Sequence, residues 1–330
     1  MAKVGCAGIL VADLFCGPLA EFPAPGQLVT IDEMPFAVGG CAANVAVNLT
    51  TQGVDAELLG CLGKDADGQM LQQILRDRGV NCERVVWVDH LSTSKTVILL
   101  IVGQDRRYVH LIGANAALTA EHFEHAWLSE LDLFYLGGVF AMPGLDPDRL
   151  LGVLKFCRTA GVSTVLDVVI PQGFKDQSSL QQLLPYVDYF LPNDEEAAQI
   201  TGCKSSTDQL QCLQEMGAKT VIITRGRSGV AAIQDDVFWE LGAYNVPAID
   251  PSGAGDAFAS GLIVGILRGW AMPEILRYAS AVGASAIRAV GTTTSVFRES
   301  EAINFVESHP LPFETGRLEP STVAEHRHGS

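Results

Sequence analysis

The sequence predicts an α/β protein with a doubly wound, mostly parallel sheet, helices on both faces and a small β-sheet lid. Short apolar runs typical of buried strands alternate with helical stretches along most of the chain, which is the pattern of parallel α/β sheets. A chain of 330 residues that is 48% hydrophobic and 18% charged can bury a large core. Two segments break the alternation and carry turn signals of their own.

The expected elements of the sheet follow one another in order. The apolar run from Val4 to Leu10 is expected to be a first buried strand, because it is too short for a membrane span and is soon followed by Asp13. Helical periodicity predicts helices such as 42–52 and 69–78. The later strand-like runs are 56–61, 131–136, 163–167, 187–191 and 220–224.

The lid is expected from segments 14–38 and 93–112. The first is rich in Pro and Gly, and the second has β-branched and aromatic residues around the turn at 103–105. We expect residues 1–307 to form a single domain. Residues 308–330 lack apolar periodicity and are expected to be a flexible tail.

Residues 250–258 (DPSGAGDAF) carry the clearest chemical signal. Gly253, Ala254 and Gly255 allow a tight turn that leaves backbone N–H groups uncovered at the start of an apolar helix, and such a turn binds anions. Asp256 follows directly, where its carboxylate can accept a proton from a hydroxyl while the N–H groups stabilise a transferring phosphoryl group. The alternative is structural: the glycines pack a helix closely on a sheet and Asp256 caps it.

Three further strings precede this one in the chain. Residues 39–46 read GGCAANVA, residues 193–196 read NDEE, and residues 224–229 read TRGRSG after an apolar strand. Taken alone, the second is a favourable acidic helix start after Pro192, and the third is a turn between two strands. No Walker A loop is present in the sequence.

In this order the four strings resemble the motifs of the ribokinase/PfkB family of carbohydrate and nucleoside kinases. The resemblance runs from about Lys3 to about Glu307, and Pro251 and Ser252 depart mildly from the family's D-T-x-G-A-G-D-x-F. It implies a ribokinase-like fold and an ATP-dependent kinase, ribokinase- or fructokinase-like, that phosphorylates a primary hydroxyl of a sugar or sugar-like molecule.

The resemblance also implies site residues. Asp256 is expected to be the general base, with the turn at Gly253, Ala254 and Gly255 as the anion hole. The expected substrate-binding residues are Asp13, Gly39, Gly40, Asn44, Arg107 and Asp256. The expected ATP-binding residues are Asn193, Thr224, Gly226, Gly229, Gly253, Gly255 and Gly283.

Two cations are part of the same expectation. Magnesium is expected at Asn193 and Glu196, largely through water, which suits an ion that sheds its water reluctantly. A monovalent cation, potassium, is expected beside Asp250, with ligands from Ser252, Gly291 and Ser295.

Composition excludes several other classes of protein. A net charge of −16 with 22 scattered basic residues argues against nucleic-acid binding. Eight cysteines without a C-x-x-C indicate neither a zinc site nor a disulfide framework. No segment has the length of apolar residues that a spanning helix needs, so we expect a cytoplasmic protein without a membrane partner.

The sequence leaves open which molecule accepts the phosphoryl group and which oligomer the protein forms. A nucleoside kinase needs an aromatic platform, for which Phe15, Phe36 and Tyr108 are candidates. An acid sugar is favoured if Arg107 points inward. The chain could also be a non-catalytic sugar-sensing protein, or an oxidoreductase if 253–255 were a dinucleotide turn, although that fingerprint belongs after the first strand. A homodimer through the lid is expected from the resemblance.

Overall fold

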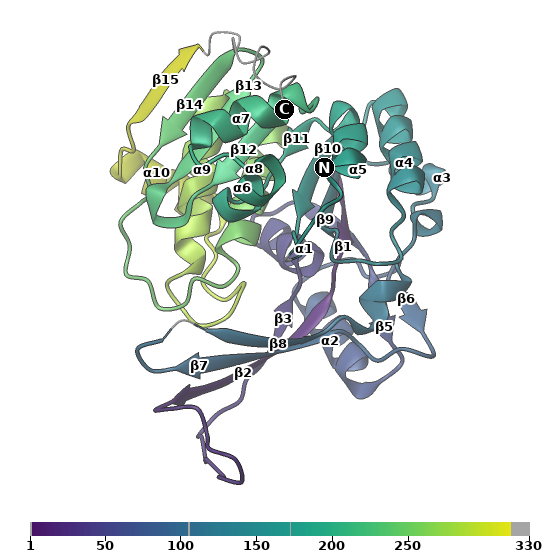
Figure 1. Ribbon diagram of the computed structural model, residues 1–330, viewed down its shortest axis with the longest axis vertical. Helices are drawn as coiled ribbons and strands as arrows, with labels where there is room; N and C mark the ends of the chain where they lie inside the picture. Colours follow the sequence, from purple (N-terminus) through teal and green to yellow (C-terminus); the bar gives the residue numbers. More distant parts are fainter. Residues whose placement is uncertain (1, 105, 172, 318–330) are drawn as a thin grey trace, which may run out of the picture.

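The structure is a computed structural model that describes residues 2–104, 106–171 and 173–317 (Figure 1). A nine-stranded sheet has the order β15-β14-β13-β12-β11-β10-β9-β1-β4. From β4 to β12 neighbouring strands are parallel, and from β12 to β15 they are antiparallel. The strands are β1 Lys3–Gly8, β4 Asp55–Leu59, β9 Leu133–Val139, β10 Ser163–Val168, β11 Tyr189–Phe190, β12 Thr220–Thr224, β13 Val230–Gln234, β14 Val237–Leu241 and β15 Phe313–Arg317.

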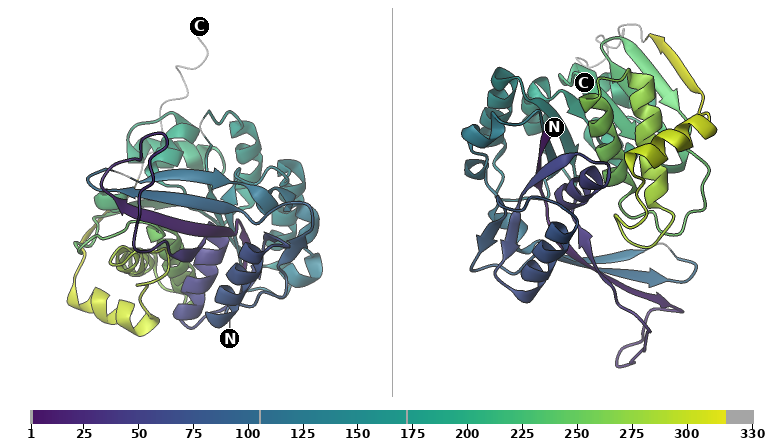
Figure 2. Two further views of the ribbon diagram at one scale, coloured as in Figure 1. Left: turned by 90° about the horizontal axis from the view of Figure 1, so that it is seen from below. Right: turned by 180° about the vertical axis from the view of Figure 1, so that it is seen from behind.

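Helices cover both faces of this sheet, as the alternation predicted (Figure 2). Alternate residues of one strand enter separate cores: Leu133 and Tyr135 of β9 lie in one, and Phe134 and Leu136 in the other. The first core includes residues of α1 Cys41–Thr51, α2 Ala66–Asp77, α8 Ala254–Leu267, α9 Met272–Ala286 and α10 Glu299–Ser308. The second includes residues of α3 His125–Leu128, α4 Pro147–Ala160, α5 Gln177–Leu183, α6 Asp194–Thr201 and α7 Ser206–Glu215.

Local sequence accounts for where several helices begin and end. At α4 the side chain of Asp146 accepts a hydrogen bond from the N–H of Arg149 at 2.9 Å, and Pro147 occupies the first helical position. The same helix ends at Gly161, whose φ of 76° is left-handed. Short 3₁₀ turns occupy Gly113–Ala117, Ala120–His122, Leu184–Tyr186 and Gly226–Ser228.

A separate four-stranded sheet, in the order β3-β2-β7-β8, forms the lid. Its strands are β2 Val11–Leu19, β3 Phe36–Gly39, β7 Lys95–Ile101 and β8 Arg107–Leu111, and they extend from the lower part of the molecule in Figure 1. The two predicted segments therefore pair, although β2 begins before residue 14. A two-stranded sheet joins β5 Cys61–Gly63 to β6 Val86–Val88.

The expectation of a flexible tail from residue 308 is wrong for Phe313–Arg317. These residues form β15, which pairs antiparallel with β14. Arg277 holds the residues at the start of β15. Its Nε donates a hydrogen bond to the carbonyl of Leu311 at 2.8 Å, and its guanidinium lies over the ring of Phe313. Most of the strand is exposed, so it carries no apolar periodicity. Residues 318–330 of that expectation lie outside the described residues.

Within the described residues, no helix has the length and apolar character to cross a bilayer. All eight cysteines are free thiols.

Close packing of α8 on α9 depends on a residue without a side chain. A Cβ at Gly261 would lie 2.8 Å from the Cα of Ala279, whereas a Cβ at Gly152, on the exposed side of α4, would meet nothing within 4 Å. We therefore expect Gly261→Ala to lower the free energy of unfolding by about 1–3 kcal/mol, because the two helices must separate. Gly152→Ala should raise it by roughly 0.5–1 kcal/mol through helix propensity. Urea denaturation of both variants tests this, and equal effects would contradict it.

Candidate active site

The N-terminus of α8 forms one wall of the candidate site. Gly253 precedes the helix with a left-handed φ of 75°, and a Cβ there would lie 2.3 Å from the carbonyl oxygen of Thr292. Both the backbone angle and the close approach therefore require glycine. The first turn of a helix leaves N–H groups without intrahelical partners, and here Gly255 and Asp256 line a cavity. The turn that the sequence predicts to bind anions thus lies at a helix N-terminus.

Asp256 is held in one orientation by a chain of side chains. Its Oδ2 accepts a hydrogen bond from Nδ2 of Asn44 at 2.7 Å. The Oδ1 of Asn44 lies 3.0 Å from the hydroxyl of Thr292, which also lies 2.6 Å from the carbonyl of Val38. Burial raises the pKa of Asp256 to about 6, against the lowering effect of its hydrogen bonds to Asn44 and Cys41. The carboxylate is therefore positioned and more basic than an exposed aspartate.

Asp13, Gly39 and Gly40 come together beside Asn44. Asp13 and Gly39 belong to the adjacent strands β2 and β3, and a Cβ at Gly39 would lie 2.1 Å from Oδ2 of Asp13. Gly40 has a φ of 90°, and its Cβ would lie 2.4 Å from the carbonyl of Ile9. Gly39 thus leaves room for the Asp13 carboxylate, and Gly40 allows the close approach of the Ile9 backbone. Burial raises the pKa of Asp13 to about 7, a hydrogen bond from Thr96 lowers it, and the charge of Asp256 raises it.

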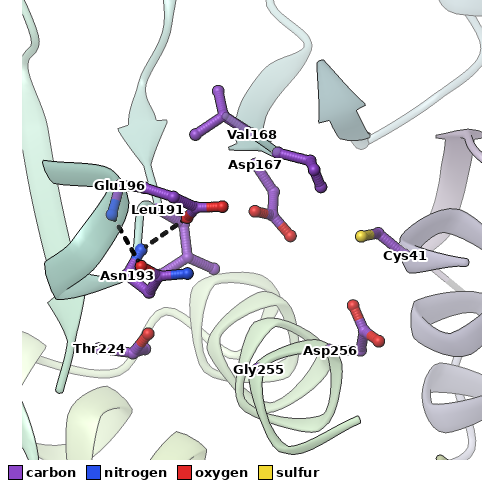
Figure 3. A pocket seen from close by; sticks show the side chains of 10 residues that line it. Cys41, Asp167, Val168, Leu191, Asn193, Glu196, Thr224, Gly255 and Asp256 are labelled. Carbon is purple, nitrogen blue, oxygen red and sulfur yellow. Dashed lines mark hydrogen bonds between the residues drawn. The ribbon is translucent and has the colours of Figure 1, made fainter. Parts of the chain in front are cut away.

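Two residues of the site, Cys41 and Asp167, are not among those expected from the sequence. Ligand atoms of Cys41, Asp167 and Asp256 lie within 4.8 Å of one another, and Figure 3 shows the three side chains facing one another. Asp167 lies near the carboxyl end of β10 and accepts a hydrogen bond from the hydroxyl of Tyr135 at 2.8 Å. An acid that ends an apolar run predicted as a parallel strand was the available signal. Burial, followed by the charges of Glu196 and Asp256, raises the pKa of Asp167.

Asn193 and Glu196 lie across the same cavity of about 210 Å³ (Figure 3). They form a reciprocal helix cap: the N–H of Glu196 donates to Oδ1 of Asn193 at 2.8 Å, and the N–H of Asn193 donates to Oε2 of Glu196 at 2.9 Å. The structural reading of this string is therefore correct. The cap is compatible with a metal role, because Glu196 also lines the cavity. Burial raises the pKa of Glu196 to about 7, its backbone hydrogen bonds lower it, and the charges of Glu195 and Asp194 raise it.

The donor set fits a hard divalent cation. Asp167, Glu196 and Asp256 offer carboxylate oxygens of raised pKa, so a bound cation would favour their ionised forms. Oxygen ligands suit Mg²⁺, whereas the thiol of Cys41 does not. Burial and the nearby acids also raise the pKa of that thiol well above its usual value.

A second cavity of about 810 Å³ adjoins the first, sharing Thr224 and Gly255. Gly226, Gly229 and Gly283 also line it, so the structure brings together most of the residues expected to bind ATP. Gly229 has a φ of 86°, and a Cβ there would lie 2.0 Å from the carbonyl of Leu241. Apolar residues complete the walls, including Val246, Ile249, Phe258 and Ile287. A cavity of this kind can enclose a flat apolar ring next to the anion-binding turn.

The residues expected around a monovalent cation make other contacts. Asp250 accepts hydrogen bonds from the N–H groups of Ser252 and Gly291, both at 3.0 Å. Gly291 thus presents its N–H to Asp250 rather than its carbonyl. The hydroxyl of Ser295 is 2.7 Å from the carbonyl of Ser285. The side chain of Arg106 contacts Asp250 and Ser252. These residues therefore do not fit a potassium site as they stand.

Arg107 does not join the expected substrate-binding residues. It is exposed, donates to Oε1 of Gln104 at 2.8 Å and lies over the ring of Phe22. Its neighbour Arg106 is the lid arginine that reaches the body of the protein. The side of the lid sheet that each of these adjacent arginines faces depends on strand register, which the sequence does not show.

Known proteins resemble this chain along most of its length. The model of the pfkB family of carbohydrate kinases matches residues 1–298. A ribokinase of Haemophilus influenzae is 24% identical over 293 residues, covering 87% of this chain and 92% of its own. A nucleoside kinase of Methanothermobacter thermautotrophicus is 27% identical over 285 residues, covering 86% and 89%. A structure of Arabidopsis thaliana ribokinase with ribose and ATP has a TM-score of 0.77 at 22% identity, covering 93% and 98%, and shares the fold.

The raised pKa of Asp13 predicts a pH-dependent stability. The folded state holds a proton on Asp13 up to about pH 7, whereas the unfolded chain releases it near pH 3.8, so stability falls as pH rises between these values. Asn cannot titrate, so we expect Asp13→Asn to be more stable than wild type above pH 7, by on the order of 1–4 kcal/mol, and similar to it near pH 4.

Urea denaturation from pH 4 to pH 8, without nucleotide or metal, measures this difference. Glu307→Gln, at an exposed position of α10, is the matched control. A constant difference between Asp13→Asn and wild type at all pH values would contradict the assignment.

Proposed function

This chain belongs to the pfkB family of carbohydrate kinases, and we propose that it transfers the terminal phosphoryl group of ATP to a primary hydroxyl of a sugar or sugar-like molecule, with Asp256 as the general base. The observation that carries the proposal is the Asp256 carboxylate, held by Asn44 beside the uncovered N–H groups that open α8. Phosphoryl transfer needs a group that accepts the hydroxyl proton and donors that stabilise the phosphoryl oxygens.

Different residues would bind the sugar and the nucleotide. Asp13 and Asn44 lie at the acceptor side, where a carboxylate and an amide can bind sugar hydroxyls. The second cavity, which shares Gly255 at the start of α8 with the first, suits a nucleotide. Asp256 accepts the proton of the attacking hydroxyl, and the N–H groups of Gly255 and Asp256 hold the phosphoryl oxygens. The lid excludes water, which would otherwise compete as acceptor.

We assign Mg²⁺ to the first cavity, the one of about 210 Å³. Asn193 and Glu196 would hold the ion largely through water, and Asp167 would be a further acidic ligand. When bound, the ion neutralises charge on the phosphates. Potassium is not part of the proposal, because Asp250 and Ser252 already contact Arg106.

A neutral sugar is favoured over the other acceptors. A nucleoside needs an open aromatic platform, and one relative is a nucleoside kinase. Of the three aromatic candidates, Phe15 is 1% exposed and Phe36 packs against the core. Tyr108 is exposed, but the guanidinium of Arg106 lies over its ring. An acid sugar would need Arg107, whose side chain is engaged with Gln104 and Phe22. A non-catalytic sensor is disfavoured because it needs no positioned base beside an anion-binding turn. A lid-mediated homodimer and a cytoplasmic location stay predictions.

The test is ADP release from ATP and Mg²⁺ across neutral sugars, acid sugars and nucleosides. We expect turnover on neutral sugars and a loss of at least about 100-fold in kcat for Asp256→Asn, since positioned acid–base catalysis contributes roughly 10²–10⁴-fold. ATP binding, measured by calorimetry, should survive in this variant. An Asn variant that keeps more than about a hundredth of wild-type kcat would remove Asp256 from the base role.

Glu196→Gln separates the metal role of this residue from its cap. Gln can still accept the hydrogen bond from the N–H of Asn193, so the helix cap and the free energy of unfolding should be kept. The lost charge should raise the Mg²⁺ concentration for half-maximal activity by about 10-fold or more. Glu196→Ala, which loses cap and charge together, is the comparison. An unchanged Mg²⁺ requirement in the Gln variant would leave Glu196 with only its structural role.

A further inference from the structure

A lid arginine contacts the loop that leads into the anion-binding turn. Arg106 lies immediately before β8, and its Nη1 is 3.1 Å from Oδ1 of Asp250, 144 residues away in the sequence. The same nitrogen donates a hydrogen bond to the hydroxyl of Ser252. The guanidinium also lies 5.8 Å from the ring centroid of Tyr108, a cation–π distance. The side chain is therefore held from both the lid and the body.

Asp250 is a buried charge that several groups share. The residue is only 4% exposed, and its two oxygens accept from Ser252 N–H and Gly291 N–H as well as from Arg106. A buried carboxylate is costly without a compensating charge. Among its hydrogen-bonding partners, Arg106 supplies the positive charge, and it comes from the lid.

The contact of Arg106 with Ser252 lies one residue before the anion-binding turn at 253–255. Ser252 is followed by Gly253, whose left-handed backbone is pressed against Thr292. Gly291, on the opposite oxygen of Asp250, is followed by the same Thr292, and the hydroxyl of Thr292 contacts Asn44. A displacement of Asp250 would therefore reach both the N–H groups of the turn and the partner of Asp256.

We propose that Arg106 is a positioning residue for phosphoryl transfer: its guanidinium holds the 250–252 loop against the lid and takes the place of the monovalent cation expected beside Asp250. The inference rests on the proposed kinase function. It has two consequences. The anion-binding turn is fully ordered only when the lid is in place, and the wild-type enzyme needs no potassium.

Arg106→Met tests the charge while keeping the apolar stem of the side chain. We expect kcat to fall about 100-fold, the effect of a small misplacement of catalytic groups. Guanidinium or potassium ions should recover at least about 10-fold of this loss by entering the vacated position, whereas tetramethylammonium at equal ionic strength should not. Wild-type kcat should be the same in potassium and tetramethylammonium salts. A purely structural role for Arg106 would produce a loss that no added cation restores.

Arg107→Met is the matched control, because it removes the neighbouring charge from the exposed position of the same lid segment. Its kcat should stay within about 2-fold of wild type and should not respond to added cations. Arg106→Lys, which keeps a positive charge, should retain more activity than the Met variant and serves if Arg106→Met does not fold. The proposal is overturned if Arg106→Met keeps wild-type kcat, if no cation rescues it, or if the wild type requires potassium.

Amide hydrogen exchange separates failure of this inference from failure of the kinase function. Without substrate or nucleotide, Arg106→Met should exchange the amides of 252–256 about 10-fold faster than wild type, and Arg107→Met should not. Unchanged exchange in Arg106→Met shows that Arg106 does not hold the loop. A wild type that is inactive on every acceptor overturns the kinase function, and exchange then decides by itself whether Arg106 holds the loop.

Discussion

The backbone turn at Gly253 is the constraint on which the site depends. Its left-handed φ and its contact with the Thr292 carbonyl set the position at which α8 begins. The apolar body of α8 then fixes the helix direction by packing on α9, with Gly261 against Ala279. Because the helix is held along its length, the N–H groups of its first turn and the Asp256 side chain have little freedom to move. A preorganised group of donors stabilises developing charge without reorganising during the reaction.

The buried acids of this site share one electrostatic property. Asp13, Asp167, Glu196 and Asp256 all have raised pKa values, chiefly because of burial. Three of them, Asp167, Glu196 and Asp256, line one cavity, and burying several carboxylates there is unfavourable without a bound cation. A bound magnesium ion would offset part of that cost because it favours the ionised carboxylates, and the proposed mechanism needs Asp256 in its ionised form.

The lid supplies residues to the candidate site as well as covering it. Asp13 stands on β2 and faces Thr96 of β7 and His110 of β8 across the sheet, so the lid supplies part of the acceptor side. Arg106, just before β8, reaches Asp250 in the loop that borders the second cavity, which we propose binds the nucleotide. One small sheet therefore touches both halves of the site. Its closure and the ordering of the turn are expected to be coupled for this reason.

The sequence by itself determined the fold class, the positions of the main parallel strands along the chain and the strings around Asn44, Asn193, Thr224 and Asp256. These depend on local patterns: apolar periodicity, glycine turns and helix starts. Only the tertiary structure decided that Asp167 and Cys41 face Asp256, that Arg106 rather than Arg107 reaches the body, and that Phe313–Arg317 pairs with β14. Those outcomes depend on strand register and on contacts between distant segments. A one-residue change of register reverses the face of every side chain, and no local pattern of the chain records it.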